Sequence, residues 1–389
     1  MMKLNKLLFN QKISYKTLEQ LFDIKNGYTP SKNNPDFWTN GNVLWFKMHD
    51  LKSNGAILND SIIKTTQSAI KKSGLCKANS IILATTATIG IHALITKEFL
   101  CNQQFTVFQI KKEYEKQVSI KFYYHYFYII DEWCKNNTKI SAFPAVDVQQ
   151  LKKLKVPFPS LELQQQVAEV LDKFSELTAE LTAELQLRKE QYEYYLNNIF
   201  NFNDVQHKNL DQIIELKTTS KSITKKDYIL DAEYDVITSS IKPSGKYNQY
   251  NQDENQITIT KDGTCGFVTW QYKKFWLAAG SFVVKPREDF KINMKYLFYF
   301  LKNSQDEIEN MKVGSPIAHL YKKHLYQLKI PIPSLEKQNQ IVKILDTFST
   351  LINDLEQGIP AEIKLRQQQY EYYRNLLLTF TKDENDKRA

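Results

Sequence analysis

Three short polar segments in the first half of the chain carry side chains that could contact a nucleic acid. IKNGYTPSK places a Gly-Tyr-Thr-Pro loop between lysines, which offers donors to phosphates and base edges. TTATIG sets three threonines beside a glycine turn, and CNQQF supplies amides that suit adenine edges. The candidate residues are Lys25, Tyr28, Thr29, Lys32, Thr85, Thr86, Thr88, Gly90, Asn102, Gln103 and Gln104.

A second group of candidates lies in the latter half of the chain. TKDGTCGF contains an Asp-Gly pair that predicts a hairpin turn, and VITSSIKPSGKYNQY mixes serines and lysines with aromatic residues. The candidates here are Ser239, Ser240, Lys242, Lys246, Lys261, Asp262, Gly263 and Thr264.

Both groups also have purely structural interpretations. Lysines in a strand-connecting loop are usually solvated, threonines pair inside sheets, and amides in turns commonly bond to nearby backbone groups. The contact of any of these residues with DNA is therefore a hypothesis from the pattern.

Motifs for catalysis are incomplete. Asn34–Phe37 reads NPDF, which is similar to the Asn-Pro-Pro-Phe loop of adenine methyltransferases, but it lacks the second proline and a Gly-rich turn. Glu362 and Lys364 form the Glu-x-Lys pair of many nucleases without a preceding metal-binding aspartate in a strand. The sequence contains no Gly-x-x-x-x-Gly-Lys-Ser/Thr loop for ATP. We therefore expect neither catalytic nor metal-binding residues in this chain.

The bulk properties favour a polyanionic partner. The chain has 389 residues, enough for two or three domains, and a formal net charge of +9. Its 4 cysteines and 6 histidines are too scattered to predict a zinc site or a disulfide framework. We find no apolar run near the roughly 18 residues that span a bilayer, and MMKLNKLLFN has too short an apolar patch for a secretory signal. We therefore expect a cytoplasmic protein.

The elements that would position the candidates begin with an internal repeat. LKVPFPSLELQQQVAEVLDKFSE starts at Leu154 and LKIPIPSLEKQNQIVKILDTFST starts at Leu328, with thirteen of 23 positions identical. Similarity resumes 178 rather than 174 positions later at LRKEQYEYY (Leu187) and LRQQQYEYY (Leu365), so the second copy has four extra residues.

Each copy predicts a long helix that follows an extended Pro-x-Pro entry, with Ser160 or Ser334 as the N-cap. Apolar residues spaced by three and four predict that the two helices pack as an antiparallel coiled-coil pair. Gly358 and Pro360 should break or kink the second helix, where the first has the tandem segment LTAELTAEL. The apolar stripes consist of Val167, Val170, Leu171, Phe174, Leu177, Leu181 and Leu185, and of Ile341, Ile344, Leu345, Phe348, Leu351 and Leu355.

The stretches before the helices have β-rich patterns and look like divergent copies of one domain, because Thr88 and Gly90 match Thr264 and Gly266 at 176 positions. The fold expected is α+β: two mixed α/β domains with β-rich cores, joined by two long helices, with an internal pseudo-twofold repeat. The expected boundaries are 1–155 and 201–330 for the domains, 156–200 and 331–380 for the helices, and 381–389 for a flexible tail.

The doubled P-x-P-S-L-E helix entry, the QYEYY helix ends, LTAELTAEL and the TTATIG and NQQF segments together resemble the specificity subunit of type I restriction-modification systems, in the branch with TAEL spacer repeats. The resemblance covers nearly the whole chain. It implies two target-recognition domains, each binding one half of an asymmetric bipartite site in double-stranded DNA, and a gap between the halves that depends on the number of TAEL units.

The resemblance also implies partners. Two methyltransferase (M) subunits and the restriction (R) subunits would dock on the helices and carry the adenine methyltransferase and endonuclease activities. S-adenosylmethionine, ATP and Mg would belong to those partners, and this chain would bind no cofactor. The alternative is a stand-alone DNA-binding regulator with a coiled-coil dimerisation region. Two diverged domains in one chain argue against it, because a dimeric repressor obtains its second head from a second chain.

Overall fold

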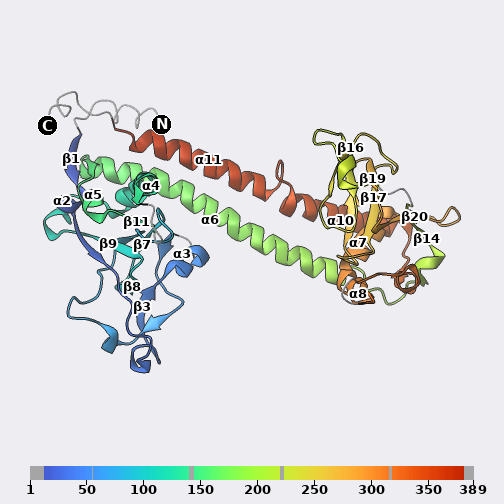
Figure 1. Ribbon diagram of the computed structural model, residues 1–389, viewed down its shortest axis with the longest axis horizontal. Coiled ribbons are helices and arrows are strands. Elements are labelled where there is room, and N and C mark those ends of the chain that lie inside the picture. The colour runs from blue at the N-terminus through green and yellow to red at the C-terminus, as the bar shows by residue number, and fades with distance from the viewer. Residues whose placement is uncertain (1–12, 55, 140–143, 220–222, 315–317, 381–389) are drawn as a thin grey trace. The chain divides into compact units, whose positions relative to one another are not determined.

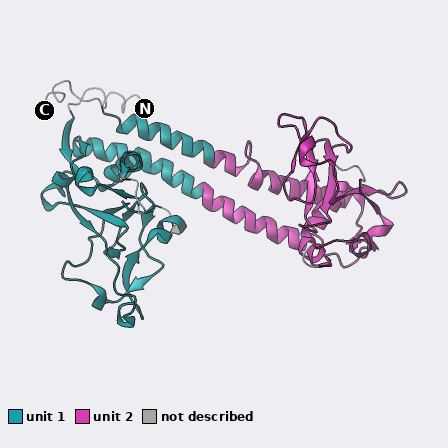
Figure 2. Ribbon diagram, in the orientation of Figure 1, with its two compact units in different colours: residues 1–180, 364–389 teal, residues 181–363 magenta. Residues whose placement is uncertain are grey.

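The chain forms two compact units in the computed structural model, which describes residues 13–54, 56–139, 144–219, 223–314 and 318–380. Unit 1 comprises residues 1–180 and 364–389, and unit 2 comprises residues 181–363 (Figure 2). Each unit therefore combines one globular domain with the beginning of one long helix and the end of the other.

Unit 1 contains a five-stranded sheet and a three-stranded sheet. The five-stranded sheet has the order β2(Phe22–Asn26), β9(Phe105–Ile110), β6(Ser80–Ala84), β7(His92–Ile95), β4(Ile57–Leu58). The three-stranded sheet has the order β5(Lys64–Thr65), β3(Val43–Phe46), β8(Phe99–Cys101), with β3 parallel to β8. The described residues of this domain also form two small antiparallel pairs, β1(Ser14–Thr17) with β12(Lys155–Phe158) and β10(Thr138–Lys139) with β11(Ala145–Val146). Its α-helices include α2(Leu18–Leu21), α3(Met48–Asn54), α4(Ile120–Asn136) and α5(Val148–Lys152).

Unit 2 repeats this topology. Its four-stranded sheet has the order β14(Ile214–Lys217), β20(Ser281–Pro286), β17(Gln256–Thr260), β18(Val268–Gln271). Its three-stranded sheet has the order β16(Gly245–Tyr247), β15(Tyr234–Ile237), β19(Phe275–Leu277), again with one parallel pair, β15 with β19. The remaining elements are β13(His207–Asn209) paired with β21(Lys329–Pro331), α7(Met294–Asn303), α8(Gln305–Asn310) and α9(Lys322–Leu325).

The correspondence between the units is close along the chain. Strands β6 to β9 of unit 1 and β17 to β20 of unit 2 have the same bounds 176 positions apart. Even the left-handed residue before the first of these strands recurs, as Asn79 with φ 56° and Asn255 with φ 58°. The prediction that the two domains are divergent copies is confirmed.

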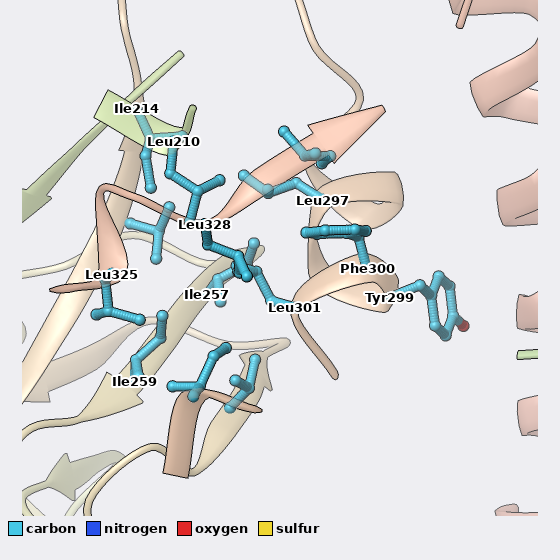
Figure 3. Packing of buried hydrophobic residues seen from close by; sticks show 14 of the residues in the cluster. Leu210, Ile214, Ile257, Ile259, Leu297, Tyr299, Phe300, Leu301, Leu325 and Leu328 are labelled. Atoms are coloured by element: carbon cyan, nitrogen blue, oxygen red, sulfur yellow. The ribbon is translucent and has the colours of Figure 1, made fainter. Parts of the chain in front are cut away.

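The core of each domain lies between the main sheet and one aromatic-rich helix. In unit 2, Ile257 and Ile259 of β17 pack against Leu297 and Leu301 of α7 (Figure 3). In unit 1 the aromatic segment KFYYHYF lies in α4, whose Phe122, Tyr123 and Phe127 are completely buried. The candidate residues lie largely in the loops that connect the strands of these sheets.

The long helices begin where the sequence places them. Helix α6(Leu161–Asn198) is unbroken through LTAELTAEL (Figure 1), and α10(Leu335–Asn353) starts after Ser334, whose Oγ accepts the N–H of Lys337 at 3.3 Å. The stretch expected as one second helix, 331–380, contains two helices: α10 ends at Asn353, and α11(Ile359–Leu378) follows a turn. The break predicted from Gly358 and Pro360 is confirmed.

The apolar stripes divide their contacts between a domain and a neighbouring helix. Val167 and Leu171 lie in the core of unit 1, and Ile341 and Leu345 lie in the core of unit 2. Further along, Phe174 of α6 stacks on Tyr373 of α11 in unit 1, and Tyr195 of α6 packs on Phe348 of α10 in unit 2.

In both units the beginning of one helix therefore lies beside the end of the other, which is the antiparallel pairing predicted. Leu177, Ile344 and Leu355 of the apolar stripes are exposed. Leu355 falls in the turn between α10 and α11, where the helical spacing is lost.

Candidate nucleic-acid interface

Each long helix is seated on its domain by a buried glutamine. In unit 1, Oε1 of Gln164 accepts the N–H of Ser119 at 2.8 Å, and its Nε2 donates to the carbonyls of Gln117 and Pro159. In unit 2, Oε1 of Gln338 accepts the N–H of Asn293 at 2.9 Å, and its Nε2 donates to the carbonyl of Pro333. Because these bonds satisfy buried backbone groups at a helix start, they fix the helix direction relative to its own domain.

About two turns further along each helix, an aspartate makes a second set of bonds to the domain. Asp172 accepts hydrogen bonds from Lys121 at 2.6 Å and from Nε2 of His125 at 2.9 Å. Asp346, 174 positions later, accepts bonds from Lys295 at 2.7 Å and from the hydroxyl of Tyr299 at 2.6 Å. The two junctions are thus built alike, except that a histidine in unit 1 is replaced by a tyrosine in unit 2.

His125 is completely buried and neutral in this setting. Burial lowers the pKa of His125, and the opposing bond to Asp172 does not cancel that effect. Since Nε2 donates to Asp172, Nδ1 accepts from the hydroxyl of Tyr370 at 2.9 Å. Burial would raise the pKa of Asp172, but the hydrogen bonds from His125 and Lys121 outweigh it and lower that pKa.

The candidates of unit 1 converge from three distant segments onto one edge of the five-stranded sheet. The backbone N–H of Tyr28 donates to the carbonyl of Cys101 at 2.7 Å, and the N–H of Thr85 donates to the carbonyl of Gln104 at 3.0 Å. The hydroxyl of Thr29 is bonded to the side-chain oxygen of Gln103. The structure therefore brings the GYT, TT and NQQ segments together.

Several of these side chains have structural partners, as the alternative interpretation expected. Thr85 is buried and pairs with the hydroxyl of Thr106 at 2.9 Å. Asn102 and Gln104 bond to each other, Lys25 donates to the carbonyl of Leu75, and the hydroxyl of Tyr28 donates to the carbonyl of Ala69.

The remaining candidates of unit 1 are more accessible, apart from Gly90, which is buried. Gln103 and Lys32 are exposed, and Thr29, Thr86 and Thr88 are half-buried. Gly90, with φ 73°, ends the turn, and a Cβ there would lie 2.7 Å from the carbonyl oxygen of Asp131.

The candidates of unit 2 also come together, around the connection between β17 and β18. The turn predicted from Asp262 and Gly263 is present, but it spans residues 261–267 rather than a tight pair, and Gly263 has φ 64°. The β15–β16 loop lies against it, because a Cβ on Gly263 would contact the hydroxyl of Ser239 at 3.8 Å.

Other candidates of unit 2 are peripheral to this turn. Ser240 and Lys242 are exposed in the same loop as Ser239, and Lys246 lies on β16, where it pairs with Asp235 at 3.5 Å. Thr264 is exposed, and its carbonyl accepts a bond from the hydroxyl of Thr260.

His319 is a member of this cluster that the sequence did not indicate. Its Nδ1 lies 2.8 Å from Oδ1 of Asp262, while Nζ of Lys261 lies 2.6 Å from Oδ2 of the same carboxylate. His319 is 57 residues from Asp262 in the chain. No spacing rule connects residues so far apart, so only the fold could reveal the pair.

A groove lies beside each helix junction. In unit 1 it has a volume of about 450 Å³ and is lined by Lys121, Glu169, Asp172, Lys173 and Glu176, among others. In unit 2 it has a volume of about 690 Å³ and is lined by Asn339, Lys343, Asp346, Thr347 and Thr350, among others. Most of these residues correspond at 174 positions, so the chain presents the same kind of groove twice.

The polar atoms at the NPDF and Glu-x-Lys segments support no catalytic assignment. Asn34–Phe37 caps and forms a single 3₁₀ turn, in which the side chain of Asn34 accepts the N–H of Asp36. Glu362 and Lys364 lie in the first turns of α11. Within the described parts of the chain, no helix has the length and apolar character needed to cross a bilayer.

Comparison with known proteins gives a consistent result. The family model described as type I restriction modification DNA specificity domain matches residues 10–188 and again 203–365. The EcoprrI type I restriction enzyme specificity subunit of Escherichia coli is 35% identical over 371 residues, which is 90% of this chain and 91% of that protein. The EcoR124I/EcoR124II specificity subunit of Escherichia coli is 34% identical over 262 residues, covering 60% of this chain and 64% of that protein.

Solved structures show the same fold. The type I restriction-modification S subunit from M. genitalium superposes with a TM-score of 0.61 at 18% identity, over 96% of this chain and 98% of that one. A chain from a study of complex assembly and conformational transition in a type I R-M system gives a TM-score of 0.63 at 15% identity, over 94% of this chain and 97% of that chain.

Proposed function

The chain belongs to the type I restriction-modification DNA specificity family, and from that membership we propose how its two units divide the recognition of DNA. It is the non-catalytic specificity subunit of such a system. Unit 1 reads one half of a bipartite site and unit 2 reads the other. The observation that carries this proposal is the repetition of one domain topology in two units whose exposed turns carry different side chains.

The difference between the units makes the site asymmetric. Two identical domains in one chain would read the same sequence twice, as a homodimeric repressor does. Here the NQQ turn of unit 1 corresponds to Ala278, Ala279 and Gly280 in unit 2, so the two turns offer different hydrogen-bonding groups. The comparisons give no support to the stand-alone regulator that the sequence also allowed.

We propose the two grooves as the docking sites of two methyltransferase subunits, with the restriction subunits joining the resulting complex. The support is that most residues lining the two grooves correspond at 174 positions, and that each groove contains an aspartate, Asp172 or Asp346, paired with a lysine, Lys121 or Lys295. A repeated groove suits two copies of one partner. Those partners would use S-adenosylmethionine, ATP and Mg, and the complex would act in the cytoplasm.

The test is to co-express the chain with its cognate methyltransferase subunit and map methyl-adenine across a genome by single-molecule sequencing. We expect a gapped, asymmetric motif that is methylated once on each strand. A palindromic motif, or copurification of the two proteins without any methylated motif, would contradict the division of reading between the units.

A second experiment tests the grooves. Glu176→Lys in unit 1 and Thr350→Lys in unit 2 place a new positive charge on two exposed groove residues that correspond at 174 positions. Each variant should reduce the number of methyltransferase subunits bound per chain, measured by native mass spectrometry. The matched exposed substitution Glu132→Lys, on α4 and away from the groove lining, should leave that number unchanged. Full binding to both groove variants would place the partners elsewhere.

A further inference from the structure

The turns that carry the candidate residues, 85–90 in unit 1 and 261–266 in unit 2, are called the reading turns. They share one set of backbone hydrogen bonds, which forms a common frame. Thr85 donates its N–H to the carbonyl of Gln104 in unit 1, and Lys261 donates to the carbonyl of Gly280 in unit 2. The N–H of Ala87 bonds to Pro144, and the N–H of Gly263 bonds to Ala318. These bonds link corresponding positions, so the frame is the same although most of the side chains differ.

The torsion angles repeat as well. Ala87 has φ 63° and Gly263 has φ 64°, while Gly90 has φ 73° and Gly266 has φ 90°. An alanine with positive φ is rare and costs about 1 kcal/mol or more, so the fold keeps this turn even against local strain. Differences in recognition must therefore come from the side chains placed on the frame.

The two units carry their polar side chains at different positions of this shared backbone. Unit 1 carries its amides on the Asn102–Gln104 turn, while its facing positions are Thr86 and Ala145, joined by a backbone bridge. Unit 2 has Ala279 where unit 1 has Gln103, and it carries Asp262 and His319 at the bridge that corresponds to Thr86 and Ala145. The polar side chains therefore lie on the Asn102–Gln104 turn in unit 1 and at the bridge between Asp262 and His319 in unit 2.

The Asp262 and His319 pair has the geometry of a positioned hydrogen-bonding group. Burial would raise the pKa of Asp262, but the bonds from Lys261 and His319 outweigh it and lower that pKa, so the carboxylate is ionised. Because an ionised carboxylate can only accept, Nδ1 of His319 donates to Asp262, and Nε2 is the ring nitrogen left available to a ligand. The His319 side chain is 45% exposed, so a ligand can reach it.

The surroundings of His319 suit DNA. Tyr321, Lys322 and Lys323 follow it and are exposed, with Nζ of Lys323 lying 5.9 Å from the centre of the Tyr321 ring. Interleaved aromatic and basic residues beside a polar turn are typical of nucleic-acid surfaces, where lysines hold phosphates while a neighbouring group reaches a base.

We propose that Asp262 and His319 form the base-reading pair of unit 2, with Asp262 as the positioning residue and Nε2 of His319 accepting a hydrogen bond from an exocyclic amine in the second half-site. Adenine N6 and cytosine N4 are the amines that the major groove presents. This inference rests on the proposed function, and it assigns to unit 2 a reading group different from the amides of unit 1.

The test uses the full chain assembled with its cognate methyltransferase subunit and compares methylation motifs. His319→Ala should lower methylation at the wild-type site about tenfold or more and relax one position of the second half-site, leaving the first half-site unchanged. His319→Gln, which keeps a side-chain acceptor, should retain more of the preference than His319→Ala. Asp262→Asn, which removes the charge that fixes the imidazole tautomer, should relax the same position.

Gln103→Ala is the matched control in unit 1 and should not alter the second half-site. Hydrogen exchange in β17 and β18 should be the same in wild type and His319 variants, which separates lost reading from lost folding. A second half-site that stays intact in both His319 variants would overturn the proposal. A wild-type complex without any bipartite motif would instead overturn the proposed function, so the two failures are distinguishable.

Discussion

The helix junctions and the reading turns of this molecule differ in how closely the two units repeat each other. At the junctions, Gln164 and Asp172 of unit 1 recur as Gln338 and Asp346 of unit 2 with nearly the same partners. At the turns the backbone recurs, but Gln103 becomes Ala279 and Thr86 becomes Asp262. The comparison teaches that a junction must satisfy fixed backbone groups, whereas a turn that faces outward tolerates any side chain its frame can carry.

The largest expected effect comes from breaking a junction. Gln164→Leu leaves the N–H of Ser119 and the carbonyls of Gln117 and Pro159 without their partner in a buried place, which should cost roughly 2–4 kcal/mol. Gln338→Leu should cost less, because Gln338 is bonded to fewer groups in the described structure. Amide hydrogen exchange followed separately in α4 and α7 would locate the loss in the mutated unit.

The neighbouring substitution Gln165→Leu is the control, since Gln165 is exposed, and it should change stability by less than about 0.5 kcal/mol. If Gln164→Leu proved no worse than Gln165→Leu, the junction would owe its stability to apolar packing alone.

A smaller effect is expected at the turns, where it separates steric crowding from backbone strain. Gly90→Ala adds a Cβ that would lie 2.7 Å from the carbonyl oxygen of Asp131 at a φ of 73°, so we expect a loss of about 2–3 kcal/mol. Gly263→Ala has the same kind of φ, 64°, but its nearest contact is 3.8 Å away, so strain of about 1 kcal/mol is the only cost. Urea unfolding of both variants measures the difference.

Ala87 occupies the position in unit 1 that Gly263 occupies in unit 2. Ala87→Gly should therefore stabilise the fold, whereas Gly263→Ala should destabilise it, because glycine relieves the strain that alanine has at this φ. Equal losses in Gly90→Ala and Gly263→Ala would show that the crowding at Asp131 is relieved by movement of α4.

The replacement of His125 by Tyr299 between the two junctions predicts a difference in acid sensitivity. The pKa of His125 is lowered below its ordinary value of 6.5, so the unfolded chain binds a proton that folded unit 1 rejects. This contribution to stability is complete above pH 6.5 and falls as the pH drops below it, by at most about 1.4 kcal/mol per pH unit. The groups facing the ring from α6, α11, α4 and β7 are Asp172, Tyr370, Lys121 and His92.

Unit 2 has Tyr299 at this place, and burial raises the pKa of Tyr299, so it stays neutral across the acidic range. Between pH 7.5 and 5.5, the protection of the amides against hydrogen exchange, relative to their intrinsic rate at each pH, should fall more in α4 than in α7. His125→Tyr, which imitates the arrangement of Tyr299 beside Asp346, should remove that difference. An equal loss of protection in both helices of the wild type would assign the acid sensitivity to other groups.

The features that could be predicted from the sequence are those with a local cause. Ser334 as a cap, the break at Gly358 and the repeat of β strands all follow from residue type or from self-similarity. It also found the three segments of unit 1 that meet at one sheet edge, but it could not tell that Thr85 is buried against Thr106. His319 was missed because its partner Asp262 is distant in sequence and because its counterpart in unit 1 is Ala145, which carries no polar group.

The smallest expected effect on stability belongs to the length of α6. One further TAEL unit after Leu185 adds about 6 Å of helix and turns the following residues by about 40° beyond a full turn. Thr182, Ala183 and Glu184 of the existing unit are exposed, and the chain already contains a four-residue difference between its repeats at the turn between α10 and α11. We therefore expect unfolding free energy to change little.

The gap between the two half-sites should nevertheless widen, by no more than about two base pairs at 3.4 Å each, while both half-sites keep their sequences. Methylation mapping measures the gap and both halves in the same data. Ala183→Ser, which alters the same segment without changing its length, should leave the gap as it is. A half-site whose bases changed after the insertion would mean that α6 takes part in base reading and is more than a spacer, because a spacer can alter the distance between two recognised sequences but not their identity.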